Sequence, residues 1–456
     1  MKTLGRILLR VLVIILVLLA LAWMGVAALR WQVLDEHAYA ALTRMSEDTP
    51  VPPGENGYAA LMLADYETGD LDAAGAEAAL AADVARFADW YSGSVGALQA
   101  HVEDGGPEPG GFEPFADRGW PRRPVLAPND ARFCGLGGQG CLAQVAADPD
   151  AARAGLQEEA KRLDAMRRVL AAAHMSNPYL PTWSTPVPSW SLLRLPVTDA
   201  ALAAADGRID EAYAQTCDLL AAARRFDRSA RGIIDKRVAQ SAAEGAAALL
   251  LDLRRAHPRP ALPESCAEAI AEVDAAEAGI CLAMKGEFRM GQNLTNAWGR
   301  HGSWRPDRVL ARQLLTDSAV RNAWNARAMA PFCADDADTR ALAGEVARMV
   351  PTPAVGSTEC LAAYIDCSLL AIAMPAIDVM AAVGVDHAAK LRLLLAAQAV
   401  ADGRLAPAAA AAAAGVPGHP VAFDPATGTA SLVPKWRSGN DTPFVVELAG
   451  LVPPGE

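Results

Sequence analysis

The feature that most constrains this chain is a run of nineteen uncharged residues near its start, Val11 to Leu29, built mostly from Leu, Val, Ile and Ala. A helix rises about 1.5 Å per residue, so a run of this length can cross the ~30 Å hydrocarbon layer of a bilayer. We therefore expect a transmembrane helix over residues 11–29, with residues 1–10 on one side of the membrane and a much larger body on the other.

The charges that flank the apolar run predict its orientation. Lys2, Arg6 and Arg10 precede the run, and Arg30 alone follows it directly. Positive residues collect on the cytoplasmic side of a membrane helix, so we expect residues 1–10 in the cytoplasm and the body in the periplasm. The predicted location is the bacterial inner membrane, with the membrane contact made through residues 11–29.

A cleaved signal peptide is the main alternative to this anchor. Its apolar region normally has about 7–15 residues and ends in a small-x-small cleavage site. Here the run is longer, and its last small residues are followed by the bulky Leu29, Arg30 and Trp31. An uncleaved anchor is favoured over cleavage, and a buried helix of a soluble fold is the third interpretation.

Length and charge restrict the classes of partner. At 456 residues the chain has room for two or three domains of about 150 residues each, and 52% apolar residues can fill their cores. The net charge is −12. Nucleic-acid binding depends on Lys and Arg that neutralise phosphates, so we expect no nucleic-acid partner and a partner within the cell envelope instead.

The cysteines predict one specific disulfide. All eight follow the apolar run, and an oxidising compartment would favour their pairing. Cys134 and Cys141 enclose the flexible sequence Gly-Leu-Gly-Gly-Gln-Gly, which can bring the two Cα atoms within about 6 Å. We predict this bond and leave the other pairings open. The eight are Cys134, Cys141, Cys217, Cys266, Cys281, Cys333, Cys360 and Cys367.

A second cysteine pair has the same spacing but a different predicted structure. Cys360 and Cys367 fall in a helical pattern, in which seven residues separate the ends by about 10 Å. We expect at least one of them to bond elsewhere, for example to Cys333. No Cys-x-x-Cys occurs and no His lies at ligand spacing, so the sequence predicts no metal site.

The apolar spacing predicts a mostly α-helical body. A juxtamembrane helix and a proline-containing linker occupy residues 30–54, and a helical periplasmic domain follows over residues 55–405. Within it, residues 72–102 form a long helix, residues 264–288 another, and residues 291–307 a loop. No repeat of fixed period is present, so a solenoid is not expected.

After residue 405 the sequence pattern changes from long helices to a short Ala-rich run and strand signals. Residues 406–456 begin with an Ala-rich helix over 408–414 that ends at Gly415. Residues 421–423, an Asp-Pro-Ala-Thr-Gly turn and residues 429–433 then predict a β-hairpin, and residues 444–448 a further strand. We expect a small β unit at the end of the helical body.

Four acidic residues within apolar helical runs are weak candidates for catalysis. Two carboxylates that share a cleft in unequal environments could act as acid and base. The structural interpretation is that each forms an ion pair or lies in solvent, because buried carboxylates need partners, and we favour it. The four are Glu244, Glu287, Asp366 and Asp378.

Aromatic residues in two proline- or glycine-containing segments are weak candidates for ligand binding. Rigid aromatic rings beside prolines can line a groove for a glycan or a peptide. The alternative, which we favour, is that each ring fills a gap between Ala-rich helices. The candidates are Tyr179, Trp183, Trp190, Trp298 and Trp304.

Common catalytic signatures are missing from the sequence. It contains no Gly-x-Ser-x-Gly elbow, no His-Glu-x-x-His and no phosphate-binding glycine loop, and its seven His are scattered. We therefore expect no cofactor.

Short motifs along the chain carry a resemblance. They are Glu55 to Leu61 (ENGYAAL), Phe133-Cys134, Cys141-Leu142-Ala143 and Phe423 to Gly428 (FDPATG). In this order, after an anchor helix, the chain resembles an uncharacterised group of single-pass, membrane-anchored helical envelope proteins of Gram-negative bacteria. The terminal motif of that group more often reads Asp-Pro-Phe-x-Gly, and here Ala426 replaces the aromatic residue. The resemblance implies an envelope location and a helical architecture, and it brings no activity with it.

These observations lead to two expected functions from different classes. The first is a non-enzymatic envelope protein that binds a partner or ligand through its helical body. The second is an envelope hydrolase that acts on peptidoglycan or glycan with paired carboxylates, which would need two of the four acids within about 10 Å of each other in an open cleft. A purely structural spacer is a third possibility and would contain no concave site.

Overall fold

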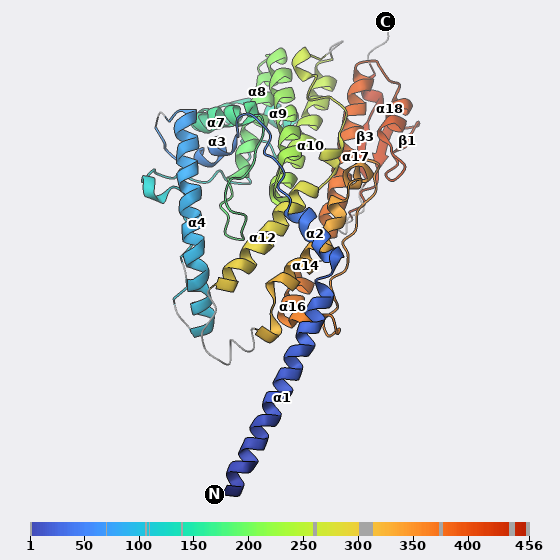
Figure 1. Ribbon diagram of the computed structural model, residues 1–456. Helices are drawn as coiled ribbons and strands as arrows, with labels where there is room; N and C mark the ends of the chain where they lie inside the picture. The colour runs from blue at the N-terminus through green and yellow to red at the C-terminus, as the bar shows by residue number, and fades with distance from the viewer. Residues whose placement is uncertain are drawn as a thin grey trace.

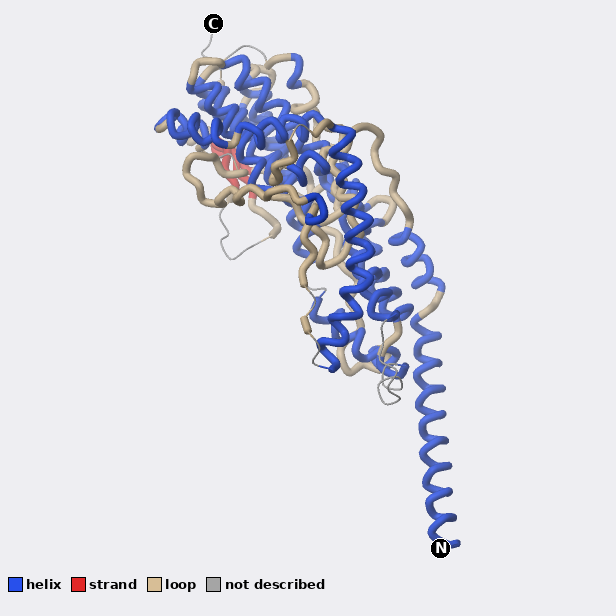
Figure 2. Tube along the Cα trace, turned by 90° about the vertical axis from the view of Figure 1, so that its left-hand side faces the viewer, coloured by secondary structure: helices blue, strands red, loops and turns tan. Residues whose placement is uncertain are grey.

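The computed structural model describes residues 2–69, 71–104, 107–108, 110–137, 140–258, 262–300, 313–373, 377–436 and 443–452. The protein is mostly helical, with a small antiparallel sheet near the C-terminus, as the sequence predicted. Helix α1 (Lys2–Val33) projects from the body as an isolated rod (Figures 1 and 2). Its apolar side chains are exposed from Ile7 to Met24.

Helix α2 (Glu36–Ser46) connects this rod to the body. Asp35 caps it by accepting a hydrogen bond from the Ala38 amide, 2.8 Å away. Arg30 of α1 also binds the body, because its guanidinium donates to the Ala362 carbonyl at 2.9 Å and pairs with Asp317 at 3.3 Å. The last turn of α1 is therefore fixed to the body.

The remaining helices follow local signals that the sequence contains. Asp148 caps a helix that has Pro149 in its first turn, and Gly207 ends another in the left-handed conformation. The helices are α3 (Tyr58–Leu63), α4 (Ala73–Asp104), α5 (Cys141–Ala147), α6 (Pro149–Glu158), α7 (Ala160–Ala171), α8 (Arg194–Ala205), α9 (Ile209–Ser229), α10 (Ile233–Ala256), α11 (Ala275–Ala278), α12 (Cys281–Arg300), α14 (Ser318–Met329), α15 (Ala337–Leu342), α16 (Tyr364–Ala373), α17 (Ile377–Ala401) and α18 (Pro407–Ala414).

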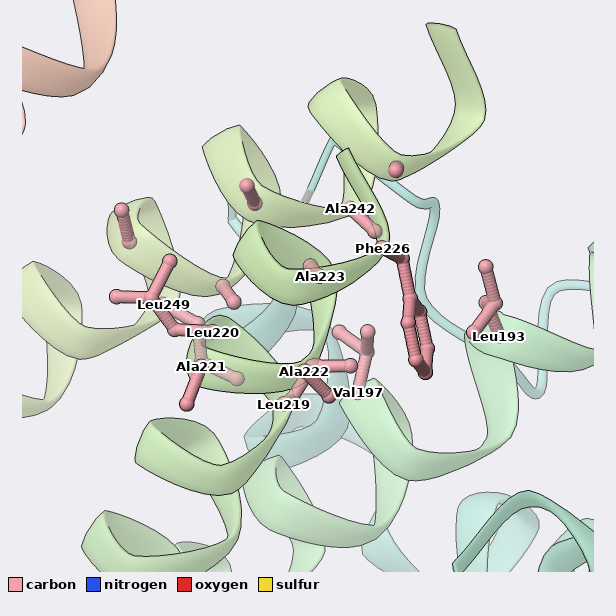
Figure 3. Packing of buried hydrophobic residues seen from close by; sticks show 14 of the residues in the cluster. Leu193, Val197, Leu219, Leu220, Ala221, Ala222, Ala223, Phe226, Ala242 and Leu249 are labelled. Carbon is pink, nitrogen blue, oxygen red and sulfur yellow. The ribbon is translucent and has the colours of Figure 1, made fainter. Parts of the chain in front are cut away.

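Buried side chains form two cores. The larger, which we call the far core, is built by α3 to α10, α17, α18 and the sheet. Alanines let its helices approach closely, and larger side chains fill the remaining gaps: in Figure 3 the ring of Phe226 lies beside Leu193 and Val197. The smaller, the near core, lies beside α1 and is built by α2, α12, α14, the 3-10 turn η5 (Cys360–Ala363) and α16.

The sheet has three short strands in the order β1-β2-β3, all antiparallel. They are β1 (Ala422–Asp424), β2 (Thr429–Leu432) and β3 (Phe444–Glu447). Ala430, Leu432 and Val446 face the far core. The sheet therefore shares its core with α10 and α17, while the domain boundaries that we expected from the sequence remain a prediction.

The structure contains four disulfides and no free cysteine among the eight. The predicted Cys134–Cys141 bond is present, with Cα atoms 5.3 Å apart. The other pairs are Cys217–Cys266, Cys281–Cys333 and Cys360–Cys367.

The Cys360–Cys367 bond contradicts our expectation. We assumed one continuous helix, but residues 360–363 form a 3-10 turn and the α-helix begins only at Tyr364. The Cα atoms lie 5.5 Å apart, so the chain bends where the two elements meet and does not continue as one straight helix. Cys333 is bonded to Cys281 and not to either of these cysteines.

Two helix boundaries also differ from those predicted. Residues 264–288 are not one helix, because η3 (Glu264–Cys266) and α11 precede α12. Helix α12 continues to Arg300, through much of the expected loop at 291–307. Glycine at 291 lowers helix propensity by only about 1 kcal/mol, and packing of α12 on α14 and α2 offsets it.

Candidate functional site

A cleft of about 740 Å³ lies at the end of the body opposite α1, where α10, α17 and β3 lie side by side (Figure 1). Its volume falls within the range of roughly 300–1,000 Å³ typical of ligand sites. The side chains and glycines that line it are Gly135, Leu136, Gly137, Gly140, Ser241, Glu244, Ala248, Leu251, Asp252, Arg255, Lys390, Leu394, Phe444, Val445, Val446 and Glu447.

Helix α10 supplies one wall through residues at helical spacing. Ser241, Glu244 and Ala248 are three and four residues apart, so they share one face with Leu251 and Arg255. This wall is therefore one face of a regular α-helix.

The glycine-rich loop inside the Cys134–Cys141 bond forms the adjoining wall. A Cβ at Gly245 of α10 would overlap the Leu136 carbonyl oxygen, so only glycine permits this approach. The disulfide fixes the loop at both ends. The glycines therefore have a use beyond closing the disulfide, because they bring backbone to the edge of the cleft.

Glu244 is the central charged group of the cleft. Its carboxylate accepts hydrogen bonds from His387 Nδ1 at 2.9 Å and from Lys390 Nζ at 3.2 Å, and both residues belong to α17. Burial raises the pKa of Glu244, but the hydrogen bonds and charges of His387 and Lys390 outweigh this, and the net pKa lies below its usual value. Glu244 is therefore an anion, which can only accept hydrogen bonds, and His387 Nδ1 carries the donated hydrogen.

A second charged group lies farther along α10. Arg255 donates to Asp252 Oδ1 at 3.0 Å and to the Glu447 carbonyl oxygen at 3.1 Å. Burial raises the pKa of Asp252, and the charge of Arg255 opposes this rise. Between these two polar clusters, Leu251, Leu394 and Phe444 present apolar surface.

The outer edge of β3 forms the third wall. The Leu448 amide donates to the Gly428 carbonyl, so Leu448 and Val446 face β2. Residues alternate along an antiparallel ladder, so the backbone groups of Val445 and Glu447 face away from β2. The Glu447 carbonyl bonded by Arg255 confirms this direction. Within the described residues, the Val445 amide and carbonyl and the Glu447 amide have no hydrogen-bond partner.

The other three candidate acids lie in other parts of the structure, and each accepts a hydrogen bond from a backbone amide. Asp366 accepts from the Asp317 amide at 2.8 Å and pairs with Arg321 at 3.1 Å in the near core. Asp378 accepts from the Met349 amide at 2.7 Å. Neither contributes to the cleft lining.

Glu287, which belongs to α12, caps the N-terminal end of α10. It accepts from the Ile233 amide at 3.1 Å, in the first turn of α10. Its neighbour is Asp235: burial and the charge of Glu287 raise the pKa of Asp235 to about 6. Burial also raises the pKa of Glu287. Both pKa values are raised, so the two environments do not separate an acid from a base; Asp235 was not among the four predicted acids, and neither residue lines the cleft.

The aromatic candidates do not form one groove in the described residues. Tyr179 is buried and donates to Asp83 Oδ2 at 2.6 Å, with its ring against Phe87. Trp190 packs against the far core, and Trp183 is exposed. Of the other two, Trp298 belongs to α12, but its side chain lies outside the described residues, as does the whole of Trp304.

No cluster of three or more His, Cys, Asp or Glu that could hold a metal ion occurs within the described ranges. The polar groups of the cleft are mixed in sign, with Glu244, Asp252 and Glu447 against Lys390 and Arg255. The arrangement can bind polar and apolar parts of one ligand together.

Sequence reasoning found Glu244 but missed its partners. His387 and Lys390 are three residues apart in a mostly apolar helix, a spacing that places them on one face. That signal was available, whereas their approach to Glu244 depends on how α10 and α17 pack. The β3 edge was missed because a strand prediction does not show which edge remains unpaired.

Comparisons with protein-family profiles, with curated proteins and with solved structures find no match to this chain.

Proposed function

We propose that this protein is a single-pass, membrane-anchored binding protein of the bacterial envelope whose cleft takes an extended segment of another polypeptide. The observation that carries the proposal is the cleft at the end of the body opposite α1, bordered by paired charges and by an edge of β3 that pairs with no other described strand.

The anchor is supported by α1. Its segment Arg6–Val33 is long and apolar enough to cross a membrane, and none of its apolar core is covered by the body. Each large apolar side chain moved out of water contributes roughly 1.5–3 kcal/mol, so a bilayer is the environment this helix fits. The positive residues before it favour a cytoplasmic N-terminus, and the body then lies in the periplasm.

The compartment is supported by the cysteines. All eight are paired at disulfide distance. Disulfides persist in oxidising compartments such as the periplasm and are rare in the bacterial cytosol. A periplasmic body and an uncleaved inner-membrane anchor account for both features together.

A polypeptide ligand is supported by the backbone groups of β3. An extended chain that added itself to this edge would pair with the Val445 amide and carbonyl and with the Glu447 amide. Strand addition of this kind supplies affinity through main-chain hydrogen bonds, and alternate side chains supply specificity. Leu251, Leu394 and Phe444 would receive apolar side chains of the ligand.

The hydrolase alternative has less support. Glu244, Glu287, Asp366 and Asp378 each have separate partners, and Glu244 is the one of the four that lines the cleft. A glycosidase needs two carboxylates across one bond. The cleft also contains Asp252 and Glu447, but Glu244 is paired with Lys390 and His387, and Asp252 is paired with Arg255. We therefore favour binding over hydrolysis.

Photo-crosslinking in intact cells tests this function. A benzophenone amino acid replaces Val445 at the β3 edge, and in a matched control it replaces Val125, an exposed valine outside the cleft. We expect adducts at position 445 that mass spectrometry maps to one short linear segment of an envelope protein. Equal adducts at position 125, or none at position 445, would contradict the proposal.

A further inference from the structure

Helix α16 has an unusual distribution of polarity. Its exposed residues are apolar, together with Leu361 in the preceding turn: Leu361, Tyr364, Ile365, Leu369 and Ile372. The most exposed is Ile372, at 79%. The intervening Ser368 satisfies its own hydroxyl by donating to the Tyr364 carbonyl at 2.9 Å. Apart from the Tyr364 hydroxyl, the outer face of α16 is therefore apolar.

The inner face of α16 contains the charge. Asp366 is buried and pairs there with Arg321 of α14, beside Cys367 and Leu370. A surface helix of a soluble protein has the reverse order, with apolar residues inside and charges outside. An exposed apolar stripe of this kind marks a contact surface.

The position of α16 identifies what covers that surface. It lies at the end of the body from which α1 emerges (Figure 1). Arg30, the first charge after the apolar run of α1, donates to the Ala362 carbonyl in η5, directly before α16. The apolar face of α16 thus begins at the level at which the apolar part of α1 ends.

Aromatic residues mark the same level. Trp31 of α1 is 84% exposed, and Tyr364 opens the outer face of α16. Trp and Tyr concentrate where hydrocarbon meets lipid headgroups. An amphipathic helix that lies in this zone inserts its apolar face about 5–10 Å into the membrane surface.

We propose that α16 is an interfacial helix, which inserts Leu361, Tyr364, Ile365, Leu369 and Ile372 into the outer leaflet beside α1. This inference rests on the proposed membrane anchor. With α16 inserted, the body contacts the bilayer at two points and is held in one orientation, with the elements that line the cleft at the end of the body away from the membrane.

Spin labels on the full-length chain in phospholipid vesicles test the inference. All native cysteines are in disulfides, so a single introduced thiol takes the label. The three variants are Ile372→Cys on α16, Leu16→Cys in the middle of α1, and Val445→Cys at the far end. For each, collision with oxygen, which concentrates in lipid, is compared with collision with a water-soluble nickel chelate.

We expect the oxygen-to-nickel collision ratio at position 372 to exceed that at position 445 several-fold and to lie below that at position 16. A high ratio at 16 with a low ratio at 372 would overturn the inference and leave the anchor intact. A low ratio at 16 would overturn the anchor itself. Strong spin–spin broadening at 372 would overturn the inference in favour of contact between two copies of the chain.

Discussion

Two helices of this protein, α9 in the far core and α16 in the near core, expose opposite kinds of side chain. The exposed residues of α9 are the acids Asp210, Glu211 and Asp218, whereas its buried face is mostly apolar and holds Arg224 and Asp227 in ion pairs. In α16 the exposed residues are Leu, Ile and Tyr, and an ion pair is buried beneath them. The same chain thus presents a surface suited to water at one end and a surface suited to lipid at the other.

This difference explains the arrangement of the molecule. The elements of the far core also line the cleft. The buried charges of the far core form ion pairs, such as Arg224 with Glu277. The near core is smaller, and its outer face remains apolar next to the exit of α1. The predictions that follow test each side of this comparison, beginning with the largest expected effect.

Removal of one buried charge should destabilise the far core most. Arg224 is 1% exposed, binds both oxygens of the fully buried Glu277 and donates to four backbone carbonyls. Arg224→Ala leaves the buried Glu277 with only the longer contact to Arg228, at 3.7 Å, so we expect a loss of about 3 kcal/mol in the free energy of unfolding. Arg167→Ala, at an exposed pair, should lose less than about 1 kcal/mol. Similar losses in urea denaturation would contradict the account.

Disulfides should contribute unequally to the two regions. Cys217 and Cys266 of the far core are 49 residues apart, whereas Cys360 and Cys367 of the near core are 7 apart. Closing the longer loop removes more entropy from the unfolded chain. The Cys217→Ser/Cys266→Ser variant should therefore lose about 3 kcal/mol in the free energy of unfolding, and the Cys360→Ser/Cys367→Ser variant should lose only about 1.5 kcal/mol. Denaturation midpoints measure both, and the opposite ranking would contradict this explanation.

Adjacent leucines of α16 should behave differently. Leu370 is 8% exposed and faces the near core, whereas Leu369 is 51% exposed. In detergent solution, Leu370→Ala should lose about 2–3 kcal/mol through the cavity it creates. Leu369→Ala should change stability by less than about 0.5 kcal/mol. Equal effects would show that α16 does not present the face assigned to it.

Asp235 should make stability depend on pH. Its pKa is raised from 3.8 to about 6 by burial and by Glu287, so the folded state holds this proton more tightly than the unfolded state. The stabilisation is complete below about pH 4 and is lost as pH rises through about 6. Asp235→Asn should therefore gain about 1–2 kcal/mol at pH 7.5 and nothing at pH 4. A gain that does not vary with pH would contradict the assignment.

Local patterns predicted much of the fold and little of the site. The apolar run predicted α1, and the turn at residues 424–428 predicted the hairpin, because each depends on neighbours in sequence. The Cys360–Cys367 bond was missed because it depends on a change of helix type at Tyr364. Such a change depends on packing, which periodicity does not describe.

The cleft depends still more on long-range contacts. Glu244 and His387 are 143 residues apart, and Arg255 and Glu447 are 192 apart. A single sequence indicates that an acid in an apolar helix needs a partner, but not which helix supplies it. The inverted polarity of α16 was visible in its residues, yet its outer face could be identified only after Asp366 and Arg321 were placed together.

The central claim is that an uncleaved α1 holds the body outside the inner membrane. Membrane-impermeant maleimide labelling measures this directly in cells whose outer membrane alone is permeabilised, using Thr3→Cys and Val445→Cys in the full-length chain. We predict that the thiol at 445 reacts at once, that the thiol at 3 reacts only after the inner membrane is opened, and that both remain on the intact chain. Labelling at 3 with protection at 445, or a chain shortened by loss of α1, would contradict the account.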